Sequence, residues 1–265
     1  MLLENPILKG KSLAPQRIIS LVPSQTELLF DLGLADKIVG ITKFCVHPSS
    51  GVAGKKIIGG TKNIRIDDIY ELKPDLIIAN REENKKDQIL EIAKSFPVWV
   101  SQVRNLTEAY DMILSIGHLT GTTKAAKYLL NRIKNEMDLF EKWHQMNESP
   151  FVSALYMIWN KPMMAAGQNT FINSMMELCG LRNAVKESGY PIITEKKINA
   201  LQPDLILLSS EPFPYSGKHI PSFKVMVPES KVICVNGEFY SWYGSRMALA
   251  PKYFTDLLNG FSIRH

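Results

Sequence analysis

The sequence repeats one pattern in its two halves, and this repeat constrains the fold more than any other feature. Residues 66–78 form the pattern of a short amphipathic helix, a Pro-Asp turn and a continuous apolar strand, and residues 194–208 follow the same order. A helix ends before proline because the ring cannot continue it, and a strand that is apolar throughout is buried on both faces. Such strands need helices on both sides of a parallel sheet, so the repeat predicts two similar α/β lobes.

A second, weaker repeat pairs residues 27–34 with residues 177–181. In both segments an apolar helix ends at a glycine, which suits the left-handed conformation common at helix C-termini. The two repeats have different offsets, as expected for diverged lobes.

Helices and strands alternate along each half, which is typical of doubly wound parallel sheets. In the first lobe we expect strands at 17–22, 38–41, 76–79 and 98–100 and helices at 25–32, 66–72 and 86–95. In the second lobe we expect strands near 152–157, 205–208 and 232–235 and a closing helix over 246–258.

No strand signal occurs between the halves, over residues 107–146. Thr122 or Thr123 can cap a helix that carries one apolar stripe to His144, and this helix would be roughly 33 Å long at 1.5 Å per residue. The predicted organisation is therefore an N-terminal lobe over 1–104, a helical spine over 105–147 and a C-terminal lobe over 148–265.

Composition narrows the class of protein. The 265 residues are 45% apolar and 22% charged, as in ordinary globular proteins, and the net charge of +5 comes from scattered lysines rather than a nucleic-acid groove. Three cysteines without a CxxC motif indicate neither a disulfide framework nor a structural zinc site. The N-terminus lacks the apolar run of an export signal, so either the chain acts in the cytoplasm or its signal lies outside this sequence.

Catalytic motifs do not stand out. There is no GxSxG, HExxH or Walker-type glycine loop, and the pair Cys45 and His47 has no identifiable third group to orient it. We therefore expect a protein that is not an enzyme and carries no catalytic cofactor.

Three segments carry a resemblance to a known family. Residues 17–34, followed by 38–42, together with 72–78 and the second-half residues 166–167 and 178–181, resemble the helical-backbone metal-receptor family. These proteins are the substrate-binding components of ABC importers for cobalamin, ferric siderophores and haem. The resemblance covers residues 17–258 and is closest to the cobalamin-binding members. It implies a ligand cleft between the lobes, a periplasmic location, ABC permease subunits as partners and a monomer.

The ligand implied by the resemblance is large, flat and apolar with polar edges, so it needs aromatic side chains and a few hydrogen-bonding groups. By resemblance, Phe44 is a ligand wall in the first lobe, although capping the sheet edge is the alternative, and the family's aromatic near residues 60–62 is missing. Tyr190 and Trp159 match or neighbour ligand-contacting aromatics. Residues 239–243 form the densest aromatic run and are hard to bury entirely. The expected second-lobe ligand residues are Trp159, Tyr190, Phe239, Tyr240, Trp242, Tyr243 and Arg246. Arg246 would meet a ligand carboxylate or cap the final helix.

Cys45 and His47 are candidate ligands for iron or cobalt, because thiolate and imidazole both bind such metals. The alternative for His47, which precedes Pro48, is a loop residue that makes one hydrogen bond.

Family members also present one carboxylate on each lobe to arginines of the permease. Asp67 or Asp68 matches the first position, whereas Lys196 occupies the second and Glu195 lies one residue away, about 100° around a helix. The alternative for these acids is stabilisation of their own helix dipole.

The sequence thus predicts an importer component that captures a metal chelate, with cobalamin or a related corrinoid ahead of haem or a ferric siderophore. A cytoplasmic sensor or carrier of such a chelate is the alternative.

Overall fold

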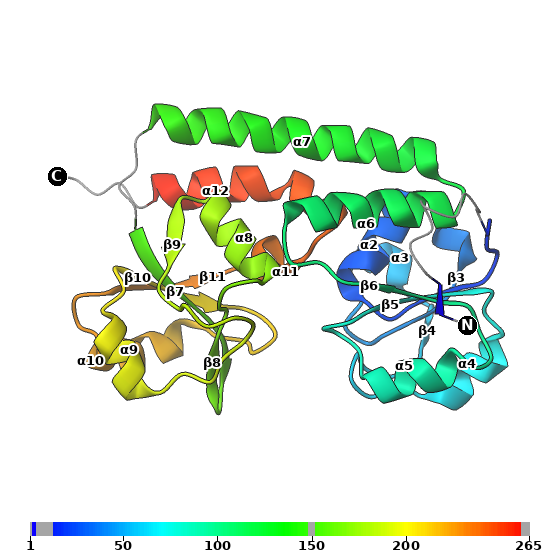
Figure 1. The fold of residues 1–265 in the computed structure, drawn as a ribbon, viewed down its shortest axis with the longest axis horizontal. Helices are drawn as coiled ribbons and strands as arrows, with labels where there is room; N and C mark the ends of the chain where they lie inside the picture. Colours follow the sequence, from blue (N-terminus) through cyan, green and yellow to red (C-terminus); the bar gives the residue numbers. More distant parts are fainter. Residues whose placement is uncertain (1, 4–12, 148–151, 261–265) are drawn as a thin grey trace. The chain divides into compact units, whose positions relative to one another are not determined.

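The computed structural model describes residues 2–3, 13–147 and 152–260 (Figure 1). The chain forms two compact units. The first contains the described residues up to Val103, then Thr107–Lys134 and Trp242–Ala248, and the second contains Arg104–Leu106, Asn135–Ser241 and the described residues from Leu249 onward. The chain therefore returns to the first unit after building most of the second.

The first unit is built on a six-stranded parallel sheet with the order β1-β6-β5-β2-β3-β4. Helices α2 and α6 lie on one side of this sheet, and α4 and α5 on the other (Figure 1). Its strands are β1 (Leu2–Leu3), β2 (Ile18–Ser20), β3 (Ile38–Ile41), β4 (Lys56–Ile57), β5 (Leu76–Asn80) and β6 (Val98–Ser101). Its helices are α2 (Pro23–Asp31), η1 (Ala35–Lys37), α3 (Ser49–Val52), α4 (Ile66–Leu72), α5 (Lys86–Ile92) and α6 (Leu106–Leu119).

The second unit has a mixed sheet with the order β11-β10-β7-β8, and β9 pairs with β7. Its strands are β7 (Val152–Asn160), β8 (Met163–Ala165), β9 (Leu181–Asn183), β10 (Leu205–Ser209) and β11 (Lys231–Val235). Its helices are α8 (Phe171–Leu178), α9 (Glu195–Leu201), η2 (Gly217–His219), α10 (Ile220–Met226), α11 (Glu238–Ser241) and α12 (Ala250–Asn259). The pair β7 and β8 is antiparallel because two residues join them, and so short a connection cannot cross over.

The repeat seen in the sequence is confirmed as a structural repeat. Helices α4 and α9 each end at a left-handed residue, Lys73 or Gln202, and the following strands β5 and β10 are buried at all five positions. The aspartate of the Pro-Asp turn accepts hydrogen bonds from backbone N–H groups in both units. Asp75 accepts hydrogen bonds from the backbone N–H groups of Gln16 (2.7 Å) and Arg17 (2.8 Å).

In the second unit, Asp204 accepts a 2.7 Å hydrogen bond from the backbone N–H of Ser153. In both cases the N–H lies at the start of the neighbouring parallel strand, β2 or β7. The Pro-Asp turn therefore ties together the beginnings of the two central strands.

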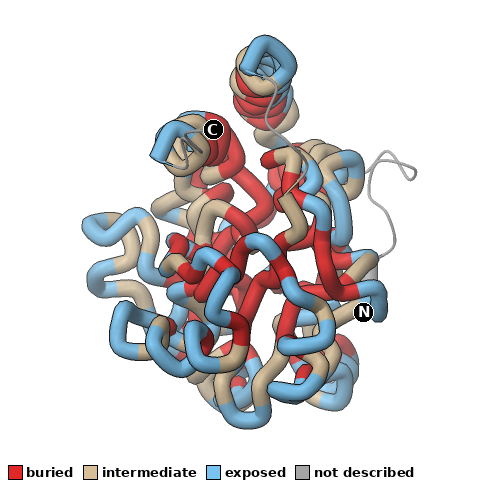
Figure 2. Tube along the Cα trace, turned by 90° about the vertical axis from the view of Figure 1, so that its left-hand side faces the viewer, coloured by how far each residue is buried: buried red, intermediate tan, exposed pale blue. Residues whose placement is uncertain are grey.

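Each unit has its own apolar core. In the first, Ile19, Leu21, Ile77 and Ala79 of the sheet pack with residues of α4 and α5. In the second, Leu155, Met157, Ile206 and Leu208 pack with Ile198 of α9 and Phe223 of α10. Buried residues follow the strands, whereas exposed residues concentrate in loops and on outer helix faces (Figure 2). Full burial of such a side chain contributes about 1.5–3 kcal/mol.

The segment predicted as a helical spine contains two helices, α6 and α7 (Thr123–Met146). The expected stripe of α7 is buried and consists of Ala126, Leu129, Leu130, Ile133, Met137 and Phe140. Residues of α7 up to Lys134 belong to the first unit and those from Asn135 to the second. None of the helices within the described residues is long and apolar enough to cross a membrane.

One predicted helix is wrong in its bounds. Instead of a single helix over 246–258, a 3₁₀ helix η3 (Ser245–Ala248) precedes α12. Pro251 stands in the first turn of α12, where its missing N–H costs nothing, and it starts a new helix there.

The shared role of the two aspartates is testable by substitution. We expect Asp75→Ala to lower the free energy of unfolding by about 1–2 kcal/mol, because two backbone N–H groups lose a charged acceptor, and Asp204→Ala to cost about half as much. Urea denaturation of each variant measures the change. The exposed Glu229→Ala control removes the same charge and is expected to change stability by less than about 0.5 kcal/mol. Equal effects of all three variants would contradict the anchoring role.

Candidate functional site

The carboxyl edge of the first unit's sheet is closed by a buried polar network. Gln25 donates a 2.5 Å hydrogen bond to the hydroxyl of Ser101, which also accepts from Asn80 at 3.1 Å. Asn84 donates to the backbone carbonyls of Leu21 (3.3 Å) and Thr61 (3.1 Å). Because parallel strands end at one edge, these side chains meet there and fix the loops in which ligand residues of doubly wound sheets are found.

Cys45 lies in a second set of buried hydrogen bonds in the same unit. Its side chain is 3% exposed, and its sulfur accepts a 3.1 Å hydrogen bond from Thr26 and lies 3.2 Å from the hydroxyl of Thr42. Burial raises the pKa of the thiol, although the hydrogen bonds from Thr26 and Thr42 oppose the shift. The structure therefore places a protonated thiol in the core, beneath the surface of the loop.

Phe44 and His47 lie in the same loop but point to different neighbours. The ring of Phe44 is 50% exposed, and a Cβ atom at Gly60 would lie 3.2 Å from it. His47 meets Trp242 edge-on, with ring centroids 5.4 Å apart. Within the described residues, no three His, Cys, Asp or Glu side chains gather closely enough to hold a metal ion. Ligation of a chelated iron or cobalt by Cys45 or His47 stays a prediction.

The aromatic run at residues 239–243 is largely built into the fold. Tyr240, Trp242 and Tyr243 are buried, and Tyr240 packs against Tyr156 with ring centroids 5.0 Å apart. Phe239 stacks on Tyr253 at 4.4 Å and is half-buried. We expected rings that are hard to bury entirely, but the segment contributes to α11 and leads into η3, and Phe239 is the one ring of the run that is half-buried rather than buried. Ligand contact by these residues stays a prediction.

Arg246 forms an ion pair with Glu27 inside the first unit. Its Nε and Nη2 donate to the two carboxylate oxygens of Glu27 at 2.9 and 2.6 Å, and its guanidinium lies 5.0 Å from the ring centroid of Trp242. Both charged side chains are mostly buried, at 11% and 15% exposed. Arg246 joins η3 to α2 and does not cap α12, whose N-terminal residue Leu249 has no side-chain cap.

In the second unit, Trp159 and Ile192 expose apolar surface, and each is paired with Met164 of β8. Trp159 is 39% exposed and pairs with Met164 across the β7–β8 hairpin, while Ile192, 62% exposed, forms a bridge to Met164. Tyr190, two residues before Ile192, is half-buried. Trp159 and the segment that carries Tyr190 therefore both neighbour β8.

A polar cavity of about 380 Å³ also lies in the second unit and was not expected from the sequence. It surrounds the start of α8, where Thr170 caps the helix by accepting from the N–H of Asn173. The lining residues are Arg104, Asn105, Gln168, Asn169, Thr170, Asn173, Ser174 and Glu177. The only sequence signal was the polar run 168–170 before an apolar helix.

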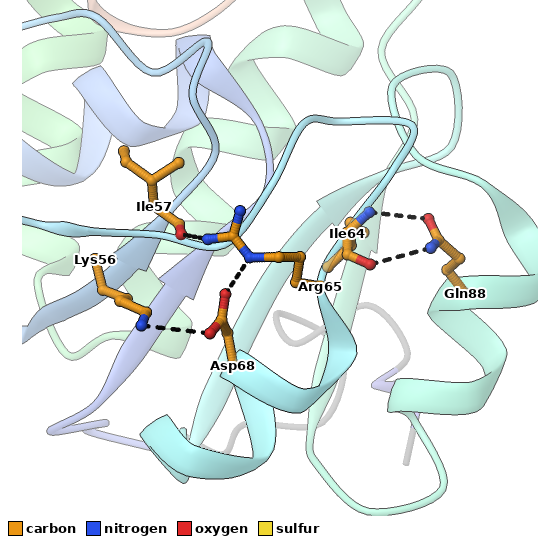
Figure 3. Close-up of polar contacts among 6 residues, drawn as sticks. All are labelled: Lys56, Ile57, Ile64, Arg65, Asp68 and Gln88. Carbon is orange, nitrogen blue, oxygen red and sulfur yellow. Dashed lines mark hydrogen bonds and ion pairs between the residues drawn. The ribbon is translucent and has the colours of Figure 1, made fainter.

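The two candidate docking acids of the first unit differ in their surroundings. Asp68 lies between Arg65, whose Nε is 2.5 Å from one oxygen, and Lys56, whose Nζ is 3.3 Å from the other (Figure 3). The hydrogen bond from Arg65 is the main reason why the pKa of Asp68 is lowered. Asp67 is exposed, and within the described part of the chain its carboxylate forms no hydrogen bond or ion pair.

The second unit does not offer an equivalent acid. Helices α4 and α9 begin and end at matching places of the repeat, so the start of α9 has not shifted. Lys196 therefore occupies the place of Asp67, and Glu195 that of Ile66. Both Glu195 and Lys196 are exposed.

Glu83 is a half-buried acid that the sequence did not single out. It lies in the turn after β5, at the carboxyl edge of the first unit's sheet, and its side chain is half-buried. Burial raises the pKa of its carboxyl group, and Lys62 lowers it by less. The sequence showed only a mixed-charge segment at 81–87, in which no acid differed from the others.

A comparison with protein families decides the class of the protein. A family model described as periplasmic binding protein matches residues 18–218. The chain belongs to this family. The resemblance stated from the sequence is thereby confirmed: the protein is a substrate-binding protein of the type that serves ABC importers.

Individual relatives of this periplasmic binding protein agree with that class. An uncharacterised ABC transporter substrate-binding lipoprotein of Bacillus subtilis, YvrC, is 30% identical over 73% of this chain, and the match spans 63% of the relative's length. A vitamin B12-binding protein of Vibrio cholerae is 26% identical over 77% of this chain and 74% of its own. The solved structure of the periplasmic haem-binding protein BhuT with two haems shares the fold, with a TM-score of 0.80, 21% identity and coverage of 92% and 98%.

The structural role of Arg246 can be tested in this binding protein by a double-mutant cycle. We expect Arg246→Ala to lower the free energy of unfolding by about 2–4 kcal/mol, because Glu27 loses its partner in a mostly buried place. The double variant with Glu27→Ala is expected to lose less than the sum of the single variants. Lys252→Ala, which breaks an exposed ion pair with Asp256, is the control and should cost less than about 1 kcal/mol. Additive effects in urea denaturation would contradict the proposed pair.

Proposed function

We propose that this protein captures a metal chelate for an ABC importer, and that the chelate is cobalamin or a related corrinoid rather than haem or a ferric siderophore. The observation that carries the proposal is the match to a vitamin B12-binding protein of Vibrio cholerae, which is 26% identical over 77% of this chain. The proposed task is to hold the ligand and release it, and this task requires no catalytic step.

The exposed aromatic side chains support a flat, apolar ligand. Phe44 in the loop after β3 of the first unit and Trp159 near the end of β7 in the second are both partly exposed. An aromatic ring left half-exposed costs free energy in water, which a stacked macrocycle would recover. The polar cavity beside α8 supplies amide and hydroxyl groups suited to a ligand's polar edge.

We further propose that Asp67 is the permease-docking carboxylate of the first unit. Asp68 is already held by Arg65 and Lys56, whereas Asp67 is exposed at the start of α4. In the second unit Lys196 stands at the equivalent place, so Glu195 would have to act from a neighbouring helix position. A cytoplasmic carrier is the alternative function, and the basic residue at that place favours it.

Ligand capture is tested by titrating the purified protein with cyanocobalamin, haemin and a ferric siderophore in a calorimeter. We expect cyanocobalamin to bind at micromolar concentration or below, and Phe44→Ala and Trp159→Ala each to weaken binding by about tenfold through loss of ring contact. Tyr128→Ala, which removes an exposed ring on α7, is the control and should not change affinity. Capture fails as a function if none of the three ligands binds at micromolar concentration.

Docking is tested by uptake in cells that carry the importer. We expect Asp67→Asn to reduce cobalamin uptake several-fold while the dissociation constant of the purified protein stays unchanged, because the lost charge lies outside the ligand-binding loops. Glu195→Gln is expected to have a smaller effect. Unchanged uptake with Asp67→Asn would favour the cytoplasmic carrier.

A further inference from the structure

The turn that carries Glu83 is held rigidly by two buried asparagines. The side-chain oxygen of Asn80 accepts from the backbone N–H groups of Glu82 (2.8 Å) and Glu83 (3.1 Å). The side-chain oxygen of Asn84 accepts from the backbone N–H of Asn80 at 2.8 Å, and its amide nitrogen binds the carbonyls of Leu21 and Thr61. Glu83 is therefore fixed from both sides.

Glu83 follows β5 and lies close enough to the loop after β3 for its charge to influence Cys45. The turn follows β5, and the negative charge of Glu83 raises the pKa of Cys45, which lies in the loop after β3. Lys62 and Glu82 are the other charged groups that influence its carboxyl group. The ammonium of Lys62 donates to the backbone carbonyl of Glu82.

Within the described residues, no hydrogen bond or ion pair is formed by the carboxylate oxygens of Glu83. Glu27 and Asp68, the other half-buried acids discussed for this unit, are both held by basic side chains. A half-buried carboxylate without donors costs free energy, which is also why its pKa is raised. Two buried asparagines therefore fix the turn of Glu83, whose carboxylate accepts no hydrogen bond from the described residues.

The charges nearby indicate which ligand edge such an acceptor would select. The guanidinium of Arg246 donates to both carboxylate oxygens of Glu27, which balances its charge. A carboxylate that approached Glu83 would meet a like charge, whereas an amide or ammonium N–H would find an acceptor already in place. Among flat metal chelates, corrinoids carry carboxamides around the ring, whereas haem carries carboxylates.

We propose that Glu83 is a specificity-determining residue that accepts hydrogen bonds from carboxamide N–H groups at the edge of a corrinoid and disfavours chelates that present carboxylates there. This inference rests on the proposed capture of a metal chelate and adds the chemistry of the edge that is read.

Two corrinoids with the same ring provide the test, since dicyanocobinamide carries amides and dicyanocobyrinic acid carries carboxylates. We expect the wild-type protein to prefer dicyanocobinamide. Glu83→Gln keeps the shape of the side chain but removes its charge, so we expect it to weaken dicyanocobinamide binding by about tenfold and to leave dicyanocobyrinic acid unchanged or more tightly bound. Calorimetry gives both dissociation constants.

Glu82→Gln is the matched control, because it removes the same charge from the adjacent exposed residue, and the preference should stay at the wild-type value. Glu83→Ala is a second variant, and it should also reduce the preference for dicyanocobinamide over dicyanocobyrinic acid. An unchanged ratio of the two affinities in both Glu83 variants would overturn the role of Glu83 while leaving chelate capture standing. Binding of haemin but of neither corrinoid would likewise overturn it. A wild-type protein that binds no corrinoid, haemin or siderophore would instead overturn the proposed function itself.

Discussion

The hydrogen bonds between the aspartate of each Pro-Asp turn and the start of the adjacent strand are the interactions on which the rest of each unit depends. A buried parallel strand has no hairpin to set its register, so its position relative to the next strand must be fixed elsewhere. Asp75 and Asp204 do this at the amino ends of the central strand pairs. Once these ends are fixed, the opposite ends of the strands, and the loops that follow them, are fixed as well.

Those opposite ends are closed by polar side chains rather than apolar ones, and this choice has a functional consequence. Gln25, Asn80, Asn84 and Ser101 donate hydrogen bonds to one another and to the nearby backbone while they are buried, although the side-chain oxygen of Gln25 has no partner among the described residues. Such a network favours one loop conformation, because a shift would leave further buried polar groups without partners. The turn that carries Glu83 is thereby fixed, and under the proposed function it would need little ordering when a ligand binds.

The local part of the structure could be predicted from the sequence, and the long-range part could not. The strand Ile38–Ile41 and the helix Ile66–Leu72 have the predicted bounds, because apolar periodicity and the Pro-Asp turn are local signals. The hairpin strand β8 was missed because it has only three residues. The partner of Arg246 is 219 residues away in the chain, so no spacing could indicate that it pairs with Glu27. The aromatic run was misjudged for the same reason, since Tyr240 is buried by Tyr156 and Phe254, which come from distant segments.

The missing ring near residues 60–62 has a different meaning in the structure than in the sequence. Taken alone, it removes an aromatic that cobalamin-binding relatives are expected to carry. In the fold, however, Gly60 lies directly against the ring of Phe44, at a distance that leaves little room for a side chain. A small residue at 60 therefore supports an exposed ring that comes from the neighbouring loop. What the first unit offers to a chelate is then one aromatic face at Phe44 and one unpaired carboxylate at Glu83 on the same edge of the sheet, a combination that suits a macrocycle whose face is apolar and whose rim donates hydrogen bonds.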